Sequence, residues 1–563
     1  MTEINQLKFD KKTPAILKTK KYGTNWPVVY IIHNNKEAYI GETNDASIRA
    51  NQHLTNKVRK GLNQITIISD ETFNKSSILD LESFLIKYMS ADKKFKLQNN
   101  NNGLQNHNYY QREMYETKFR EIWLKLKRKG LVQHDLKQIA NSDLFKYSPY
   151  KALTTDQYMT VNNIISDLAD FVNKKEPATF MVEGGAGTGK TILGIYILKM
   201  LSQAKDASQI EIEEDQVEQN LSKILKLNDT TDNLKIGLVI PMENLKSTLK
   251  KVFKSIKGLN PNMVLRPQDV VKSTEQYDLL IIDEAHRLRR RKNLPYFKTF
   301  DDNNKKLNLG NQGTELDWIL LKSKYQIFFY DKNQSIKPTD VRKEDFDKLK
   351  SRKNYKSYNL TTQLRCLVGG KEYIDYVNAI FSNNPPKKKI NFEKYDLKIF
   401  DNINDMIELI KDKDKKYGLC RNVAGYAWAW KSKNKKESDN EIFDIEINTY
   451  KYIWNKHSKG WINSPNSVNE IGSIHTTQGF DLNYTGLIIG NELKYDLEQN
   501  KFIVDRKNYY DVKGKADTTD EELLNYLLNI YRTMMTRGML GTYIYICDDG
   551  LRTYLQKYID IKK

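Results

Sequence analysis

The stretch FMVEGGAGTGKT, residues 180–191, constrains the fold of this chain more than any other segment. Apolar residues lead into it as a strand would, and ILGIYILKML continues from it as a helix would. The glycines between them allow backbone N–H groups to turn around a phosphate, next to the positive end of the helix. Lys190 can reach the β- and γ-phosphates of a nucleotide, and the Thr191 hydroxyl can bind Mg²⁺. The predicted phosphate-binding residues are Gly184, Gly185, Ala186, Gly187, Thr188, Gly189, Lys190 and Thr191.

Two further strand patterns end in polar residues that suit the same site. YDLLIIDEAH leads to Asp283 and Glu284, and YQIFFYDKNQ leads to Asp331 and Gln334. We expect Asp283 to hold Mg²⁺ through water and Glu284 to orient or deprotonate the attacking water. The Gln334 amide is a candidate sensor of the γ-phosphate. From about residue 150 onward, strand-like runs alternate with helical ones, which predicts a parallel α/β sheet. The glycine-rich loop with Lys190, Thr191 and Asp283 predicts ATP and Mg²⁺ as cofactors.

Residues 150–563 resemble the superfamily 1 helicases and, more narrowly, a bacterial helicase-like ATPase group related to the Schlafen helicase domains. The segments that carry the resemblance are LTTDQYMTV, GLVIPMENLKSTL, TTQLRC, SIHTTQGFD and IYRTMMTRG. The resemblance implies two RecA-like lobes with ATP between them. It implies that Gln157 contacts adenine and that Arg365 and Arg537 are arginine fingers of the second lobe. It also implies a segment that couples the nucleotide to the nucleic acid, around His475, Gln478, Gly479 and Asp481.

Two positions depart from the helicase pattern. Tyr330 stands where glycine is common, and Asp481 stands where glutamate is usual. These departures leave strand separation and simple translocation as alternatives. For the two arginines, a surface salt bridge is the alternative to a role in catalysis.

A second pattern lies roughly within residues 26–103. Strand-like runs present Tyr30 at the end of VVY and Tyr39 in YIG, and a helix after Gly41 is expected to carry Arg49 and His53 one turn apart on one face. These residues resemble the GIY-YIG nucleases, with VVY in place of the first tripeptide. The resemblance implies that they form a phosphodiester-cleaving site. A small α/β domain with tyrosines in its core is the alternative.

The same resemblance implies an acidic metal ligand on a later helix. Glu82 in LDLESFLIKYM stands at the matching place, and one carboxylate with waters would hold a single Mg²⁺ or Mn²⁺. A tyrosine phenol is the implied general base, with Tyr39 preferred to Tyr30. Asn99 is the asparagine expected to complete the site, whereas Asp80 is interpreted as a surface carboxylate.

A chain of 563 residues is too long for one core, which favours three domains. We expect a nuclease domain at 1–103, a helical connector at 104–150, a first RecA-like lobe at 151–340 and a second at 341–563. Within the connector, YYQREMYETKFREIWLKLKRKG predicts an amphipathic helix that ends at Gly130 and packs through an aromatic stripe. The acidic segment 203–235 and the basic segment 287–316 are expected to be surface insertions.

The formal net charge of +20 suits a nucleic-acid partner, although an AT-rich genome would also produce a lysine-rich chain. No apolar run approaches the ~20 residues of a membrane span, and the N-terminus lacks a signal-peptide core, so we expect a cytoplasmic protein without a membrane partner.

The two resemblances together imply an ATP-dependent nuclease–helicase or translocase that cuts nucleic acid, with DNA favoured over RNA. By analogy with bacterial nuclease–helicase proteins, the expected role is defence against phage or foreign DNA. A sensor whose ATPase switches the nuclease without translocation is one alternative, and a nucleic-acid-binding module with a decayed nuclease is another. The sequence leaves the oligomeric state open.

Overall fold

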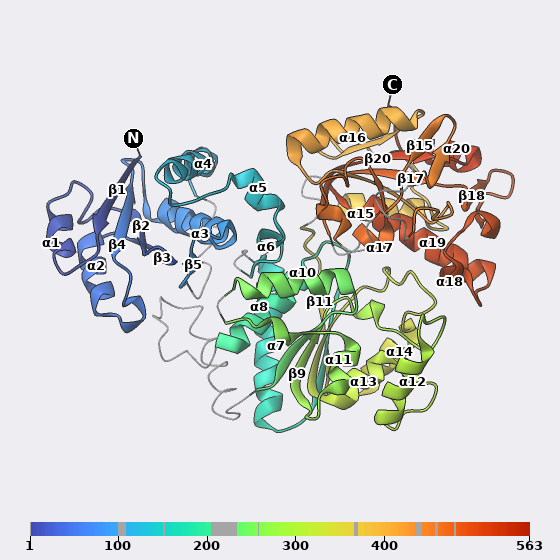
Figure 1. The fold of residues 1–563 in the computed structure, drawn as a ribbon, viewed down its shortest axis with the longest axis horizontal. Helices are drawn as coiled ribbons and strands as arrows, with labels where there is room; N and C mark the ends of the chain where they lie inside the picture. Colours follow the sequence, from blue (N-terminus) through green and yellow to red (C-terminus); the bar gives the residue numbers. More distant parts are fainter. Residues whose placement is uncertain are drawn as a thin grey trace. The chain divides into compact units, whose positions relative to one another are not determined.

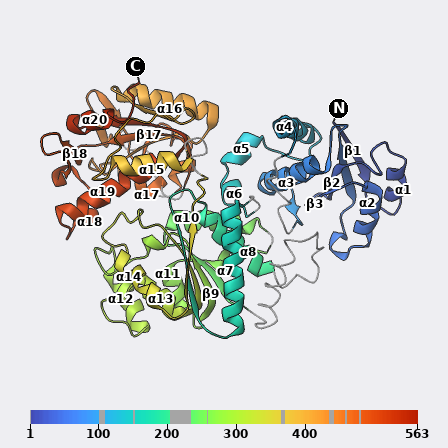
Figure 2. The same cartoon turned by 180° about the vertical axis from the view of Figure 1, so that it is seen from behind.

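A computed structural model describes residues 2–99, 109–149, 153–203, 234–256, 258–364, 370–433, 442–456, 460–477 and 480–562. The chain divides into two compact units, each described here by itself (Figures 1 and 2). The first comprises Met1–Tyr158, Ile195–Asp232 and Thr248–Met263, and the second comprises Met159–Gly194, Asn233–Ser247 and Val264–Lys563. Among the described residues, no helix combines the length and the hydrophobicity that crossing a membrane requires.

The first unit is built on a five-stranded sheet in the order β1-β4-β2-β3-β5. Its strands are β1 (Glu3–Lys8), β2 (Val28–His33), β3 (Glu37–Thr43), β4 (Gln64–Ser69) and β5 (Lys96–Leu97). The β3–β5 pair is parallel and the others are antiparallel. All six residues of β2 are buried, as expected of a central strand covered on both faces. The strand-like runs predicted to carry Tyr30 and Tyr39 are confirmed as β2 and β3.

Helices complete the first unit. They are α1 (Thr13–Lys18), α2 (Ala46–Thr55), α3 (Lys75–Asp92), α4 (Arg112–Arg128), α5 (Leu136–Asn141) and α6 (Asp143–Lys146). The predicted amphipathic helix is α4, and the chain leaves it at Gly130 with a φ of +71°, which favours glycine. Its aromatic stripe packs inward as predicted, with Tyr115, Phe119, Ile122, Trp123 and Leu126 buried.

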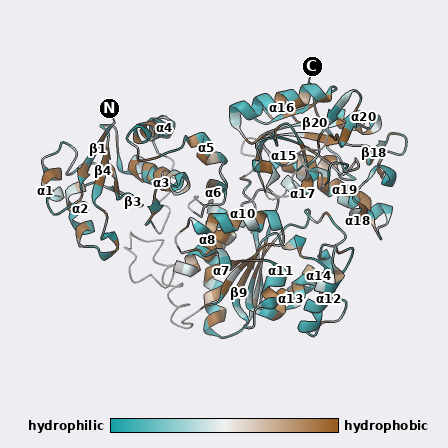
Figure 3. Ribbon diagram, in the orientation of Figure 1, coloured by the Kyte–Doolittle hydropathy of each residue, from teal (hydrophilic) through white to brown (hydrophobic). Residues whose placement is uncertain are grey.

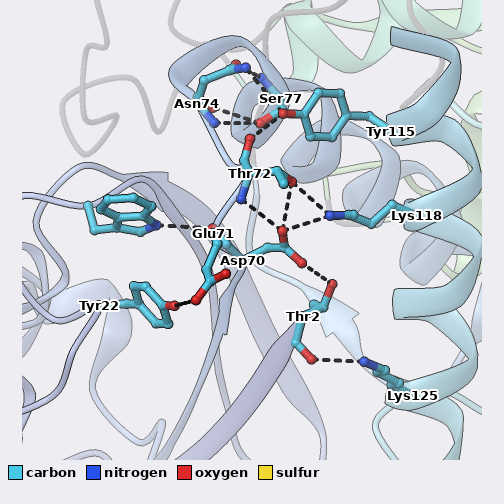
Figure 4. Close-up of polar contacts among 11 residues, drawn as sticks. Thr2, Tyr22, Asp70, Glu71, Thr72, Asn74, Ser77, Tyr115, Lys118 and Lys125 are labelled. Atoms are coloured by element: carbon cyan, nitrogen blue, oxygen red, sulfur yellow. Dashed lines mark hydrogen bonds and ion pairs between the residues drawn. The ribbon is translucent and has the colours of Figure 1, made fainter. Parts of the chain in front are cut away.

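Asp70, at the end of β4, ties α4 to the sheet (Figure 4). Lys118 Nζ on α4 donates to Asp70 Oδ1 at 2.7 Å, and the Thr2 hydroxyl donates to Asp70 Oδ2 at 2.6 Å. The Tyr115 hydroxyl donates to the Thr72 carbonyl, and Thr72 in turn donates to Asp70. Burial opposes ionisation of Asp70, but the hydrogen bonds from Lys118, Thr2 and Thr72 outweigh it and hold the pKa of the carboxyl well below its ordinary range.

The Asp70→Asn substitution is expected to destabilise the first unit by about 3 kcal/mol, because it leaves the Lys118 ammonium without its buried partner. A urea titration of the free energy of unfolding measures this effect. Since folding lowers the pKa of Asp70, its contribution is present above the ordinary aspartate pKa of ~3.9 and is lost as the pH falls below that value. The exposed neighbour Glu71 is the matched control, and Glu71→Gln is expected to change little. Equal stability of Asp70→Asn and wild type at neutral pH would contradict the role of this clamp.

The second unit contains two parallel sheets. The first, in the order β11-β6-β10-β9-β7-β8, consists of β6 (Ala178–Gly184), β7 (Ile236–Val239), β8 (Val264–Leu265), β9 (Tyr277–Ile282), β10 (Ser323–Tyr330) and β11 (Tyr355–Leu360). The nearby helices are α7 (Thr155–Asn173), α8 (Lys190–Gln203), α10 (Glu243–Lys254), α11 (Pro267–Lys272), α12 (Phe297–Lys306), α13 (Glu315–Lys322) and α14 (Lys343–Asp347).

The position of β11 corrects one predicted boundary. This strand pairs in parallel with β6, with Tyr355 opposite Thr179. The first sheet therefore extends beyond residue 340, and the boundary predicted there is too early. Residues 361–364, the described part of the TTQLRC segment that was assigned above to the second lobe, directly follow β11.

The second parallel sheet has the order β12-β20-β17-β13-β16. Its strands are β12 (Asp396–Ile399), β13 (Arg421–Ala424), β16 (Ile471–Ser473), β17 (Leu482–Ile489) and β20 (Gly538–Ile546). The helices are α15 (Gly370–Ile380), α16 (Ile403–Tyr417), α17 (Ile474–Thr477), α18 (Val512–Lys515), α19 (Asp520–Met535) and α20 (Asp549–Gln556). Two small hairpins, β14 (Ile445–Ile447) with β15 (Tyr450–Tyr452) and β18 (Leu493–Asp496) with β19 (Lys501–Val504), form separate two-stranded sheets. Figure 3 shows the outer helix α16 largely in the hydrophilic colour. The predicted α/β class with parallel-sheet lobes is confirmed.

The basic segment predicted as a surface insertion is folded onto the first parallel sheet. Arg287 is buried and lies 2.7 Å from Asp340, and Arg289 lies 2.6 Å from the fully buried Glu315. Arg291 pairs with Asp301 at 2.6 Å. Three arginines of RLRRRK are therefore each paired with a carboxylate of the same fold. Most of the acidic insertion, 204–233, lies outside the described residues.

Two candidate active sites

In the first unit, Tyr30, Arg49 and His53 meet at one hydroxyl. β2 presents Tyr30, and α2, capped by the Asp45 side chain, carries Arg49 and His53 on one face. Tyr30 Oη lies 2.8 Å from His53 Nε2, and Arg49 Nε donates to the same Oη at 3.2 Å. The i, i+4 spacing in the sequence therefore places both side chains at one point, as predicted.

Gly41 makes room for this arrangement. It lies opposite Tyr30 in the β2–β3 pair, on the same face of the sheet. A Cβ atom at position 41 would lie 2.2 Å from Tyr30 Oη, far inside van der Waals contact. The glycine is thus required by the close approach of the phenol, which the sequence indicated only through its YIG triplet.

The two tyrosines differ in their surroundings. Tyr30 is 2% exposed, and burial raises the pKa of its phenol well above the ordinary value, with Tyr39 adding to the effect and Arg49 opposing it. Tyr39 is only partly buried. Its ring lies 5.0 Å from the His53 ring and 6.3 Å from the Tyr30 ring, centroid to centroid. The more accessible phenol is therefore that of Tyr39.

Glu82 and Asn99 lie beside this group. Glu82, on α3, is 7% exposed, and its charge is among the groups that raise the pKa of Tyr30, which places its carboxylate near the phenol. A buried carboxylate whose charge acts on this site is a suitable oxygen ligand for Mg²⁺ or Mn²⁺. Asn99 binds the backbone of Ile40, accepting from its N–H at 3.0 Å and donating to its carbonyl at 2.7 Å. It thereby fixes β3 between Tyr39 and Gly41.

Asp80 is bound to the α4 segment instead. Its Oδ2 accepts a hydrogen bond from Tyr109 Oη at 3.0 Å and lies 3.7 Å from Arg112 Nε. Asp80 was interpreted as a surface carboxylate; its side chain is 19% exposed and is held by these two partners of the α4 segment.

Two residues near the site were missed from the sequence. Arg59 is 8% exposed, and its guanidinium carbon lies 3.6 Å from the centroid of the Tyr39 ring. Glu42, next to Gly41, is also 8% exposed and pairs with Lys75 at 2.5 Å. Arg59 lies in the basic run NKVRKG, which gives no signal that one of its cations is buried.

In the second unit, the glycine-rich loop joins β6 to α8. Gly187 and Gly189 have φ values of +81° and +80°, in the left-handed region that favours glycine. Lys190 Nζ donates to the carbonyls of Gly184 and Gly185 at 2.6 and 2.8 Å, and lies 3.8 Å from Asp331. The loop is also held from outside, because the Gln363 side chain donates to the Ala186 carbonyl and the Leu364 N–H donates to the Gly187 carbonyl.

Thr191 and Asp283 present the oxygen atoms that a Mg²⁺ ion requires. The Thr191 hydroxyl donates to Asp283 Oδ2 at 2.7 Å. Asp283 Oδ1 is buried and has no hydrogen-bond partner. Burial, followed by the charge of Glu284, raises the pKa of Asp283 above its ordinary value. An unsatisfied buried carboxylate beside a hydroxyl, at the start of α8, fits a divalent cation.

Glu284 adopts a conformation that is rare outside glycine, with a φ of +50°. Its Oε2 lies 2.8 Å from His286 Nε2. Burial opposes its ionisation, but the charges of His286, Lys190 and Arg537 outweigh burial and lower its pKa. Arg537, 1% exposed, lies immediately before β20, so the second sheet contributes a cation that acts on a carboxylate of the first.

The remaining predicted residues are placed as follows. Gln334 Nε2 donates to Asp331 Oδ2 at 2.6 Å, near Lys190. Gln157, 1% exposed, accepts a hydrogen bond from the Thr154 N–H at 3.0 Å, as a residue of the first turn of α7. Arg365, Gln478 and Gly479 lie outside the described residues.

Within the segment predicted to couple nucleotide and nucleic acid, His475 is among the residues that the structure describes. Burial, followed by the charge of Lys337, lowers the pKa of His475 to about 4, and Asp511, 3.9 Å away, opposes this. Lys337 follows β10 of the first sheet, whereas His475 and Asp511 belong to the second. The segment therefore lies where groups from both sheets act on one another.

Comparison with known proteins finds two families whose matched regions contain the two groups of residues. The family described as Schlafen group 3, DNA/RNA helicase domain, matches residues 177–548, and the GIY-YIG catalytic domain matches residues 27–96. An uncharacterized protein of Saccharomyces cerevisiae is 24% identical over 418 residues, which cover 68% of this chain and 84% of the yeast protein. A solved structure of C. elegans PCH-2 matches 65% of this chain and 67% of its own at 12% identity, but its TM-score of 0.18 supports no inference.

The helicase family covers well over half of the chain and includes the glycine-rich loop, Asp283, Glu284 and Arg537. The GIY-YIG match includes Tyr30, Tyr39, Arg49, His53 and Glu82. A helicase-like domain implies the use of ATP and the binding of nucleic acid, and a nuclease of this kind implies a divalent metal. The chain belongs to the Schlafen group 3 DNA/RNA helicase family and joins that helicase domain to an N-terminal GIY-YIG nuclease domain.

Proposed function

We propose that this protein is an ATP-dependent endonuclease whose superfamily 1-type motor moves along nucleic acid and supplies substrate to the GIY-YIG site. DNA is the preferred substrate, and defence against phage or other foreign DNA is the proposed role. The observation that carries the proposal is the convergence of Arg49 and His53 on Tyr30 in a chain that also holds a complete Lys190–Thr191–Asp283 phosphate and cation site.

In the nuclease site, Tyr39 acts as the general base and accepts a proton from the attacking water. The deeply buried Tyr30 is unsuited to this role, because its hydroxyl is already engaged by His53 and Arg49 and its pKa is raised. Arg49 offsets the negative charge that develops on the phosphate. Glu82 would hold the Mg²⁺ or Mn²⁺ ion, which supplies further charge neutralisation at the leaving oxygen.

In the ATPase site, the loop N–H groups and Lys190 bind the phosphates of ATP. Thr191 and Asp283 would hold Mg²⁺, which neutralises phosphate charge. Glu284 orients or deprotonates the attacking water, and its lowered pKa keeps it ionised at neutral pH. Arg537 reaches the transition state from the second sheet, as its effect on Glu284 supports. Arg365 and Gln334 are proposed to contact the γ-phosphate, Gln157 to contact adenine, and Gln478 and Gly479 to couple the two ligands.

The Arg49→Ala substitution is expected to lower the cleavage rate by ~10²-fold or more, because a positioned cation in the transition state is lost. Gel-based cleavage of a labelled strand in Mg²⁺ measures the rate. Gln52, which accepts a hydrogen bond from Arg49 on the exposed side of α2, is the control position, and Gln52→Ala is expected to retain most activity. A change below threefold for Arg49→Ala would show that this arginine is peripheral.

The Arg537→Ala substitution is expected to reduce ATP turnover by at least ~10²-fold while ATP binding stays largely intact, because an arginine finger acts mainly on the transition state. Binding of a fluorescent ATP analogue and release of phosphate are measured in parallel. Normal ATP hydrolysis by this variant would contradict the proposal that the second sheet contributes a catalytic arginine.

The proposed motor is tested by its response to strand length. A translocating ATPase hydrolyses ATP faster with nucleic acid, and its stimulation rises with the length of the strand. DNA and RNA strands of graded length are compared at one salt concentration, since binding to a polyanion is strongly salt-dependent. Stimulation that is independent of length, or absent with both polymers, would favour a switch that responds to another trigger.

A further inference from the structure

We propose that Arg59 is a positioning residue of the nuclease reaction: stacked on the ring of Tyr39, its guanidinium fixes the phenol and stabilises the phenolate that takes a proton from water. This inference rests on the proposed nuclease function and extends it to a residue outside the GIY-YIG signature. The inference gives a role in the reaction to Arg59, a buried cation that lies in the basic run NKVRKG.

The geometry of Arg59 carries the inference. The residue closes the short 3-10 turn Lys57–Arg59 that follows α2, and it is 8% exposed. Its guanidinium carbon lies 3.6 Å from the centroid of the Tyr39 ring, which is direct stacking contact. Nη1 donates to Gln98 Oε1 at 3.1 Å, and Gln98 Nε2 donates in turn to Glu37 at 2.9 Å.

The Arg59 guanidinium makes direct contact with the Tyr39 ring but does not satisfy all of its hydrogen-bond donors. Arg59 Nε is buried and has no hydrogen-bond partner, although a buried guanidinium that serves only as a structural clamp gains most when its donors are satisfied. The guanidinium thus lies against the face of Tyr39, the more accessible of the two tyrosines, in a position where one of its donors lacks a hydrogen bond. Gln98 precedes Asn99, which fixes the β3 backbone next to Tyr39, so one short segment holds both the base and its cation.

A guanidinium on the ring face favours the ionised form of the phenol, because the opposite charges attract and the site is shielded from solvent. The other titratable groups around Tyr39 act in both directions. They are Tyr30 on β2, Arg49 and His53 on α2, Glu37 on β3 and Glu82 on α3. Arg49 Nε donates to the Tyr30 hydroxyl, and the Arg59 guanidinium is in direct contact with the Tyr39 ring.

The test compares Arg59→Met, which keeps the length of the side chain and removes its charge, with Arg59→Lys, which keeps the charge. Cleavage of a labelled strand is measured with Mg²⁺ and with Mn²⁺ across the pH range, and kcat and KM are determined separately. Lys57→Met, an exposed lysine of the same turn, is the matched control for the loss of one positive charge.

Arg59→Met is expected to lower kcat about tenfold at neutral pH, with KM changed less than twofold. Its pH–rate profile is expected to shift its acidic limb upward by about one pH unit, the effect of an opposite charge in contact. Arg59→Lys is expected to return the limb to within half a unit of wild type, and Lys57→Met to leave it unmoved. A purely structural role would lower the rate without moving the limb.

An unmoved acidic limb in Arg59→Met overturns the inference, provided that Glu82→Gln is inactive and wild type cleaves, since the nuclease assignment then stands without it. A wild type that fails to cleave in either metal overturns the proposed function itself. If Arg59→Met does not fold, Gln98→Leu replaces it, because this variant removes the anchor of the guanidinium. The same upward shift of the limb is then expected, and an unchanged limb overturns the inference.

Discussion

Glu82→Gln is expected to abolish nucleic-acid cleavage and to leave ATP hydrolysis unchanged. The substitution removes the negative charge of a carboxylate that is 7% exposed and lies beside the Tyr30 phenol, while it preserves the packing of α3. A metal ion at the leaving oxygen supplies several kcal/mol of transition-state stabilisation, so its loss lowers the rate by ~10³-fold or more. Cleavage and phosphate release are measured on the same preparation.

Asp80→Asn is the matched control for Glu82→Gln, because Asp80 lies on the same helix and binds Tyr109 outside the site. It is expected to cleave at nearly the wild-type rate. Binding of Mn²⁺ to the nuclease site adds a readout that is independent of activity, and Glu82→Gln is expected to lose it. Cleavage by Glu82→Gln at the wild-type rate would exclude this residue as the metal ligand.

Lys190→Ala is expected to abolish ATP hydrolysis, with a loss of at least ~10³-fold, because the Lys190 ammonium neutralises the β- and γ-phosphates. In the structure this ammonium donates to the carbonyls of Gly184 and Gly185, in the glycine-rich loop that is proposed to surround the phosphates. The substitution leaves Asp283, the proposed Mg²⁺ ligand of the ATPase site, and the nuclease residues unchanged. ATPase activity near the wild-type level would contradict the assignment of the phosphate site.

Much of both sites was predictable because their residues are close in the sequence. The strand, loop and helix around Lys190 follow one another directly, and Arg49 and His53 share one helix face by spacing alone. Gly41 was identified by its triplet, and the structure supplies the reason, since a Cβ there would collide with Tyr30 Oη. Local order and periodicity were sufficient for the Lys190 loop and for the shared face of Arg49 and His53, whereas Gly41 was singled out by the resemblance to the GIY-YIG nucleases.

The features that were missed depend on contacts between distant segments. The stacking of Arg59 on Tyr39 and the burial of Glu42 against Lys75 have no periodic signature, because they depend on how the turn after α2 and the start of α3 meet β3. The boundary predicted at residue 340 is wrong because β11 returns to pair with β6, a long-range choice that local pattern does not encode. The pairing of Arg289 with Glu315 likewise turned an apparent surface charge run into a folded segment.

The central claim is that the motor delivers substrate to a nuclease that is chemically complete without ATP. The most direct measurement compares wild type and Lys190→Ala on a short single strand and on a long duplex, each with and without ATP in Mg²⁺. The account predicts that Lys190→Ala cuts the short strand at the wild-type rate and fails on the long duplex, whereas wild type degrades the duplex only with ATP. Equal degradation of the long duplex by the variant would contradict delivery by the motor, and loss of cleavage on every substrate would show that ATP licenses the nuclease itself.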